Sequence, residues 1–285
     1  DPTLLSNGIF TIDGVTIEKY ILIYEQYNHN EYDASDECIA CSGYIHPIGT
    51  ICHELGHVLG LPDLYDITHQ GRGIGEWGLM GSGNWQIQTS PAYMSAWSRH
   101  RLGFIDPIIL EEKTDFSLTI QPAEQNEDSE AFILPMNSNL PQEYIMIENR
   151  QDIGSDQYLA GTGMLVWHID ETITDQYPFG NEVNVNKAFY GVNLLQADGA
   201  GDLYTSTGRA DATDVYPSDG VQNIYNIDLY SYDRDADGSV EEYGDSRIEI
   251  LNIEENIQTK TISCIITNPN INGRILSHDA VNLGN

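Results

Sequence analysis

The chain has 285 residues, and 44 Asp and Glu against 12 Lys and Arg give it a formal net charge of -32 at pH 7. This charge repels phosphate backbones and anionic lipid surfaces, which argues against nucleic-acid binding and against a role on a membrane surface. The hydrophobic fraction of 40% is enough for a core in one large domain or two, and no apolar run approaches the roughly 18 residues of a membrane span.

The first 47 residues combine short apolar runs with a polar loop. Residues 9–12 and 20–24 are predicted to be strands, whereas residues 28–42 carry no periodicity and predict a surface loop. The chain opens at Asp1 without a methionine or a signal peptide, so we expect a mature or cut form.

The cysteine content is even. Two disulfides in a secreted protein, or buried thiols, are the preferred interpretation, and the pairing is left open. A Cys38/Cys41 metal knuckle completed by Cys52 is the weaker alternative, because Cys52 lies inside the helix predicted next; the fourth cysteine is Cys264.

A helix is predicted over residues 48–59, and it overlaps the segment TICHELGHVLGLPDLYD at residues 50–66. Residues four apart share one face of a helix, so His53 and His57 point the same way. Two neutral imidazoles suit zinc, which keeps one coordination position for water in catalytic sites. Glu54 would lie beside that water, where a carboxylate can accept its proton.

After the helix, Gly60 allows a left-handed turn and Pro62 prevents the helix from continuing. Asp63 then comes ten residues after His53, where a returning chain can supply a third ligand. The complete pattern HExxHxxGxxD is a strong signal for a catalytic metal site. The alternative is an ordinary helix with core histidines, and Glu76 competes with Asp63 for the third position.

Residues 71–83 contain six glycines and predict a turn. Within it, WGLMGSGNW places Met80 on a tight segment between two tryptophans. Met80 is expected to pack beneath the metal site, either as a structural floor or as filler for an irregular gap.

HELGHVLGLPDLYD followed by WGLMGSGNW resembles the immune inhibitor A family of secreted bacterial zinc metallopeptidases, which is related in design to the metzincins. GMLVWHIDE and VNLLQADG, later in the chain, are also similar to that family. The resemblance implies an α+β fold with a metzincin-like catalytic part, Asp63 as the third zinc ligand and Met80 at the Met-turn. It also implies a secreted endopeptidase that acts on extracellular proteins.

Only 52 residues precede His53, fewer than such families usually carry before the metal helix. We therefore expect a catalytic part over residues 1–106 that lacks upstream strands. Residues 107–285 are predicted to form a β-rich region packed onto it, with strands at 116–120, 131–134, 144–148, 163–169, 191–196, 248–253 and 261–266. Between the motif and these strands, Ser90 and Pro91 predict the start of a helix that continues to Leu102.

In GMLVWHID, alternation places Met164, Val166, His168 and Asp170 on one face of the strand. His168 is a candidate stabiliser of the oxyanion of a tetrahedral intermediate. The competing interpretation is a strand histidine that is hydrogen-bonded to a neighbour.

The run DxDxDG at Asp233, Asp235, Asp237 and Gly238 can wrap a hard cation, and it predicts a calcium loop in preference to a solvated acidic loop. An EF-hand is excluded because its twelfth position is Gly244. A second calcium site is a weaker hypothesis, and its residues would be Asp198, Asp202, Asp211 and Asp214.

The sequence therefore predicts a zinc endopeptidase in which Glu54 assists the attack of zinc-bound water on a peptide bond. Its expected cofactors are Zn²⁺ and Ca²⁺, and its expected partner is a protein or peptide substrate rather than nucleic acid. The alternative is a secreted, metal-stabilised binding module without catalysis, or an inactive fragment of such a peptidase.

Overall fold

The computed structural model describes backbone and side chains for residues 48–87, 90–110, 116–125, 131–136, 142–177, 181–218, 220–225 and 248–268. For residues 10–12, 15–17, 26–28, 31–32, 38–40, 43–45, 228–232 and 240–245 it describes the strand backbone alone.

The N-terminal region contains three antiparallel strand pairs. These are β1 (Phe10–Ile12) with β2 (Val15–Ile17), β3 (Gln26–Asn28) with β6 (Gly43–Ile45), and β4 (Glu31–Tyr32) with β5 (Cys38–Ala40). The strand predicted at residues 9–12 is confirmed by β1, whereas the one predicted at residues 20–24 lies outside the described residues.

The metal motif lies on α1 (Ile48–Leu59), with the bounds that the sequence predicts. The glycine-rich segment that follows contains two short 3-10 turns, η1 (Gly75–Trp77) and η2 (Ser82–Trp85). It is therefore a compact turn region, as predicted.

The predicted helix start at Ser90 is wrong, because α2 spans Ala96–Arg101 and is capped by Ser95, whose Oγ accepts the Ser98 N–H at 3.3 Å. Upstream of it, the Ala92 N–H donates to the Gly83 carbonyl and the Tyr93 N–H to the Asp156 carboxylate. These tertiary contacts hold Ala92 and Tyr93 in a non-helical segment before α2.

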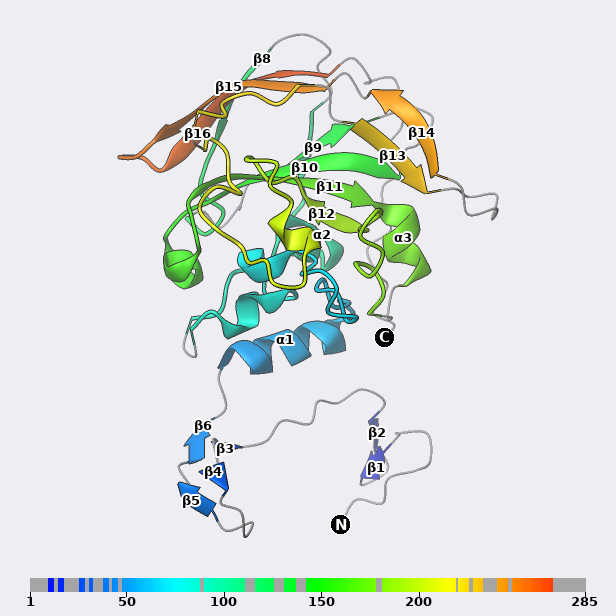
Figure 1. The fold of residues 1–285 in the computed structure, drawn as a ribbon, viewed down its shortest axis with the longest axis vertical. Coiled ribbons are helices and arrows are strands. Elements are labelled where there is room, and N and C mark those ends of the chain that lie inside the picture. Colours follow the sequence, from blue (N-terminus) through cyan, green and yellow to red (C-terminus); the bar gives the residue numbers. More distant parts are fainter. Residues whose placement is uncertain are drawn as a thin grey trace.

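A five-stranded sheet forms the centre of the molecule (Figure 1). Its order is β12 (Val192–Leu194), β11 (Gly163–Asp170), β10 (Glu143–Arg150), β9 (Ala131–Pro135) and β7 (Ile108–Ile109). All neighbours are antiparallel except β7 and β9, which are parallel.

A second, three-stranded sheet has the order β15 (Glu249–Asn256), β16 (Thr261–Thr267) and β8 (Phe116–Ile120). β13 (Asp228–Tyr232) and β14 (Val240–Asp245) form a separate antiparallel pair. The remaining short elements are η3 (Gly154–Tyr158), α3 (Glu171–Gln176) and η4 (Asp202–Tyr204). The strands predicted between residues 116 and 266 are all present, with bounds that differ by a few residues.

The central sheet is buried on both faces, because every residue of β10 and β11 is buried. On one face, Leu165 and Trp167 pack in a cluster with Leu61, Trp77 and Met80 from the metal-site region. On the other face, Met164 and Val166 pack with residues of the three-stranded sheet. The predicted alternation along β11 is confirmed, and the architecture is α+β, with α1, α2 and the turn region on one side of the sheet (Figure 1).

Buried charges also join the turn region to the sheet. Arg99 of α2 donates to Glu148 of β10 at 2.6 Å, and Arg150 of β10 binds Asp156 and donates to the Trp77 carbonyl at 3.0 Å. Described residues between 61 and 105 therefore share one core with the β-rich part. The domain boundary at residues 106 and 107 stays a prediction.

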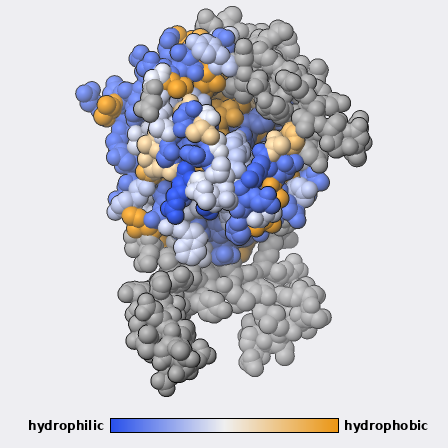
Figure 2. All heavy atoms as spheres, viewed as in Figure 1, coloured by the Kyte–Doolittle hydropathy of each residue, from blue (hydrophilic) through white to orange (hydrophobic). Residues whose placement is uncertain are grey.

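The surface seen in Figure 2 is mainly hydrophilic over the described residues, and hydrophobic residues occur there singly or in small groups. Among the described residues, no helix has the length and apolar character that a membrane crossing requires. Cys52 and Cys264 are free thiols, and burial raises the pKa of Cys264 to about 12. The side chains of Cys38 and Cys41 lie outside the described part of the chain.

Candidate metal centre

The end of α1 positions the two histidines and the returning chain. Gly60 has φ +107°, a backbone conformation that residues other than glycine rarely adopt. The Gly60 N–H donates to the His57 carbonyl, and the Leu61 N–H donates to the Gly56 carbonyl, both at 3.0 Å. The chain then turns back along the helix and brings Asp63 to the face that carries the histidines.

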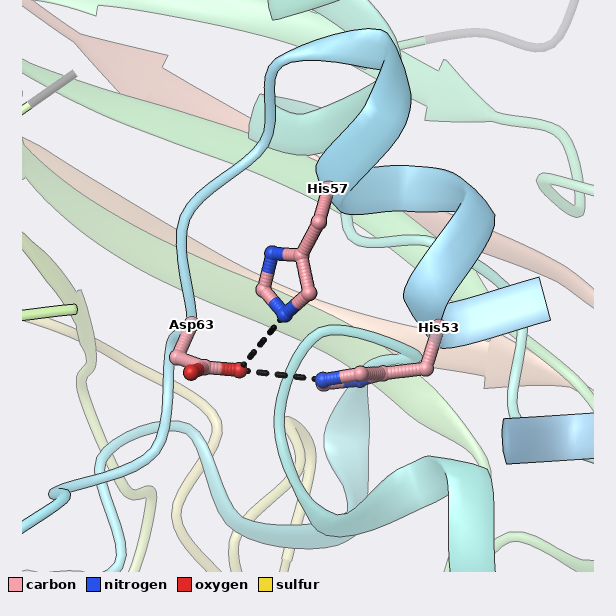
Figure 3. A group of neighbouring side chains, drawn as sticks. All are labelled: His53, His57 and Asp63. Atoms are coloured by element: carbon pink, nitrogen blue, oxygen red, sulfur yellow. Dashed lines mark hydrogen bonds and ion pairs between the residues drawn. The ribbon is translucent and has the colours of Figure 1, made fainter. Parts of the chain in front are cut away.

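His53, His57 and Asp63 form a convergent group that we call the histidine–aspartate group (Figure 3). The Nε2 atoms of His53 and His57 lie 3.0 and 3.2 Å from Asp63 Oδ1, and the ligand atoms of the group lie within 4.8 Å of one another. A tetrahedral zinc ion with ligand distances of roughly 2.0–2.1 Å has ligands about 3.3 Å apart. The spacing of the group therefore fits zinc.

The second nitrogen of each ring supports the same assignment. Nδ1 of His53 donates to the Leu79 carbonyl, and Nδ1 of His57 donates to the Leu61 carbonyl, both at 2.8 Å. In a neutral imidazole with a proton on Nδ1, Nε2 carries a lone pair. Those lone pairs would bind a metal held together with Asp63, as in metal sites with oriented histidines, whereas a hydrogen bond from Nε2 to Asp63 requires a proton on that nitrogen.

The charges of the group are strongly coupled. Burial raises the pKa of Asp63, but hydrogen bonds from His53 and His57 outweigh burial and hold its pKa at about 2. The hydrogen bond to Asp63 in turn raises the pKa of His57, against the opposing effect of burial. Asp63 is 2% exposed and ionised at neutral pH, so it supplies the negative charge that a divalent cation prefers.

Glu54 lies in a cleft of about 350 Å³ that also contains His53, and we call it the metal-side cleft. Glu54 is half-buried, and its charge contributes to the raised pKa of His57. The cleft thus places a carboxylate beside the histidine–aspartate group without making it a member.

Tyr65 also lines this cleft, and the sequence analysis did not single it out. Its ring stacks on His53 with a centroid distance of 6.2 Å. Burial, and then the charge of Asp63 and a hydrogen bond with it, raise the pKa of Tyr65 to about 12, so the phenol is a hydrogen-bond donor at neutral pH. Its position two residues after Asp63 was the only feature of the sequence that could have indicated a role for Tyr65 at the site.

Met80 is fully buried and packs against α1. A Cβ atom added to Gly56 would lie 2.5 Å from Met80 Sδ, and the Met80 carbonyl accepts the Leu64 N–H at 2.8 Å. The preceding Trp77 is held by Asp214, whose Oδ2 accepts the indole N–H at 2.8 Å. The turn region therefore supports the helix that carries the two histidines.

The competing third ligand, Glu76, is not in the histidine–aspartate group, and its Oε2 accepts the Ala210 N–H at 2.9 Å. The structure does not bring His168 to the group either. Its Nε2 pairs with Glu143 at 2.7 Å, and it shares the strand face of Met164 and Val166, opposite the metal-site side of the sheet. The contact with Glu143 corresponds to the second interpretation of His168, a strand histidine that is hydrogen-bonded to a neighbour.

The predicted calcium ligands Asp233, Asp235 and Asp237 lie outside the described residues. Asp198, Asp202, Asp211 and Asp214 were the weaker hypothesis for a second calcium site. They do not form a metal-binding group within the part of the chain that the structure describes. Asp198 accepts the Ala200 N–H, and Asp214 accepts the Asp211 N–H and the Trp77 indole N–H.

Comparison with known proteins agrees with this geometry. Residues 14–105 match the family model described as the immune inhibitor A peptidase M6 catalytic domain. A 59-residue segment is 41% identical to the pre-pro-metalloprotease PrtV of Vibrio cholerae, in two serotype O1 strains. That match covers 19% of this chain and 6% of PrtV, so the chain aligns with only a small part of its relative.

The segment that matches the family model contains the whole of α1, the histidine–aspartate group and Met80. Over this segment, the chain is similar to the immune inhibitor A family of peptidases.

Proposed function

We propose that the protein is a zinc-dependent endopeptidase that hydrolyses peptide bonds of extracellular proteins. The observation that carries this proposal is the convergence of His53 Nε2, His57 Nε2 and Asp63 Oδ1, while both Nδ1 atoms donate to backbone carbonyls. The match of residues 14–105 to a peptidase family supports a metalloprotease.

In this proposal the histidine–aspartate group holds zinc. Zinc, when bound there, would polarise the scissile carbonyl and lower the pKa of a water molecule to about 7. Glu54 accepts a proton from the attacking water and passes it to the leaving amine. Tyr65, which keeps its phenol proton, transfers its hydrogen bond from Asp63 to the developing oxyanion and takes the role that the sequence had suggested for His168.

Met80 is proposed as the methionine of a Met-turn, acting as a floor under α1 rather than as a ligand. Its burial at 1% exposure and its packing against Gly56 support that role. Secretion is proposed from the family resemblance. The calcium loop at Asp233, Asp235 and Asp237 stays a prediction.

The alternative is a binding module in which a metal serves structure alone. A structural zinc site closes its fourth position, whereas the histidine–aspartate group supplies three ligands beside an open cleft that contains a carboxylate. This arrangement favours catalysis.

Casein hydrolysis with and without a chelator, together with metal analysis of the same samples, tests the proposal. We expect hydrolysis that is lost with the metal and restored by zinc. A protein that binds zinc in one equivalent and cleaves no casein would favour the binding module or an inactive fragment.

A further inference from the structure

The metal-side cleft continues into a second cavity of about 450 Å³. The two cavities share Arg72, Ser82 and Trp85. We call the second cavity the arginine groove, because both Arg72 and Arg209 line it. A chain that lies in the metal-side cleft can therefore extend past Trp85 into the arginine groove.

The two arginines are unusual in this acidic chain. Seven Lys and Arg residues have described side chains, and four of them, Arg99, Arg101, Arg150 and Lys260, pair with carboxylates. No carboxylate of a described residue lies within ion-pair distance of Arg72 or Arg209. In a protein with 44 acidic residues, two unpaired guanidinium groups in one groove indicate a ligand with negative charge.

The local contacts hold the groove open to such a ligand. Arg72 Nε donates to the Gly208 carbonyl at 2.9 Å, which fixes one edge of the guanidinium and leaves its terminal nitrogens for other acceptors. Glu76 also lines the groove, but its Oε2 accepts the Ala210 N–H. Trp85 and Tyr158 are 57% and 48% exposed, so the walls between the charges are aromatic.

Asn84 supplies an independent observation between the groove and the metal. It lines the metal-side cleft and is 4% exposed, yet its side-chain oxygen has no hydrogen-bond partner among the described residues. Its backbone is packed against α1, since a Cβ atom on Gly49 would lie 2.1 Å from the Asn84 carbonyl oxygen. A buried acceptor without a partner is costly, and the Asn84 oxygen would gain one if the side chain turned into the cleft toward an N–H group of an extended peptide.

We infer that the substrate groove runs from the histidine–aspartate group past Asn84 to a cationic subsite formed by Arg72 and Arg209, and that this subsite binds a carboxylate of the peptide substrate. The inference rests on the proposed function, because it names the substrate chemistry of the same site. The carboxylate is an Asp or Glu side chain or the C-terminus of the peptide. It binds away from the scissile bond, because Arg209 lines the arginine groove and not the metal-side cleft.

Binding to the zinc-loaded Glu54→Gln protein tests the inference without cleavage. Fluorescent short peptides carry one Glu at successive positions, each with a Gln-matched control and with a free or amidated C-terminus. Anisotropy gives each Kd at about 0.15 M salt, where a Debye length of about 8 Å screens the distant acidic residues more than the contacting arginines.

At one position we expect Glu to bind about fivefold tighter than Gln, a preference of the size that partly exposed ion pairs give. Adding Arg209→Gln should abolish this preference. Adding Lys187→Gln, which removes the same charge from an exposed residue outside both cavities, should leave it intact. If amidation rather than Glu→Gln weakens binding, the terminal carboxylate is the ligand.

Equal binding of Glu and Gln peptides at every position and with either terminus would overturn the inference, and so would equal effects of Arg209→Gln and Lys187→Gln. Absence of any peptide binding would also overturn it. Hydrolysis by the unsubstituted protein separates the two proposals, because a cleaving enzyme without the Arg209-dependent preference refutes only the subsite. A protein with that preference and no hydrolysis refutes only the catalysis.

Discussion

The Sδ atom of Met80 lies against Gly56, on the turn of α1 between His53 and His57, so closely that a Cβ atom on Gly56 would lie 2.5 Å from it. The helix that carries His53 and His57 thus packs on the side chain of a residue 24 positions away in the sequence. Glycine at this position permits the close seating of the helix.

Gly56→Ala should therefore destabilise the metal-free protein. In an exposed helix this substitution would gain about 1 kcal/mol of helix propensity, but here the overlap with Met80 reverses the sign and should cost about 1–3 kcal/mol. Urea unfolding of the two single variants and of Gly56→Ala/Met80→Ala measures the coupling. If the contact is as described, Gly56→Ala should lower the free energy of unfolding by less in the Met80→Ala background than in the unsubstituted protein. Additive effects of the two substitutions would contradict the contact.

His57→Ala should remove metal and activity together. The substitution takes away one of three protein ligands, and we expect zinc affinity to fall by at least about a hundredfold. Competition with a chromophoric chelator measures it. His69→Ala is the matched control, because His69 lines the metal-side cleft but is not part of the histidine–aspartate group. Equal zinc affinity of His57→Ala and the unsubstituted protein would rule out His57 as a ligand.

Asp214→Asn should change how stability depends on pH. Burial raises the pKa of Asp214 from 3.8 to about 6, although the hydrogen bond from Trp77 opposes the shift. Between these values the folded protein binds more protons than the unfolded chain, so the Asp214 contribution makes the free energy of unfolding fall as pH rises.

Asparagine can accept the same two hydrogen bonds, from Trp77 and from the Asp211 amide, because both reach one oxygen. In metal-free protein, Asp214→Asn should therefore be the more stable form at pH 7 by on the order of 1 kcal/mol, with the difference shrinking toward pH 4. Urea titrations at several pH values measure this, with the exposed Asp106→Asn as a control for net charge. A difference that does not change with pH would refute the raised pKa.

The sequence predicts local features well where one rule decides. The bounds of α1 follow from the spacing of the histidines and from Gly60, whose positive φ ends the helix. The two faces of β11 follow from alternation alone. Asp63 rather than Glu76 joins the histidines because the turn after Gly60 is local and short.

Features that depend on how distant segments of the chain pack against one another could not be predicted in the same way. Ser90 and Pro91 carry a helix-start signature, but the amides of Ala92 and Tyr93 bond to Gly83 and Asp156, which are placed by the tertiary fold. Alternation assigns His168 to one face of β11, but it does not tell which face of the strand lies on the side of the histidine–aspartate group. Arg72 and Arg209 are far apart in the sequence and meet only where the loop that contains Gly208 packs against the turn region.

The most direct test of the central claim compares Glu54→Gln with the unsubstituted protein at equal zinc content. Because Glu54 is assigned to proton transfer and not to metal binding, the variant should retain zinc while casein hydrolysis falls by at least about a hundredfold. Zinc is measured on the same samples as the rate. A Glu54→Gln protein that holds its zinc and cleaves casein at the unsubstituted rate would contradict the account.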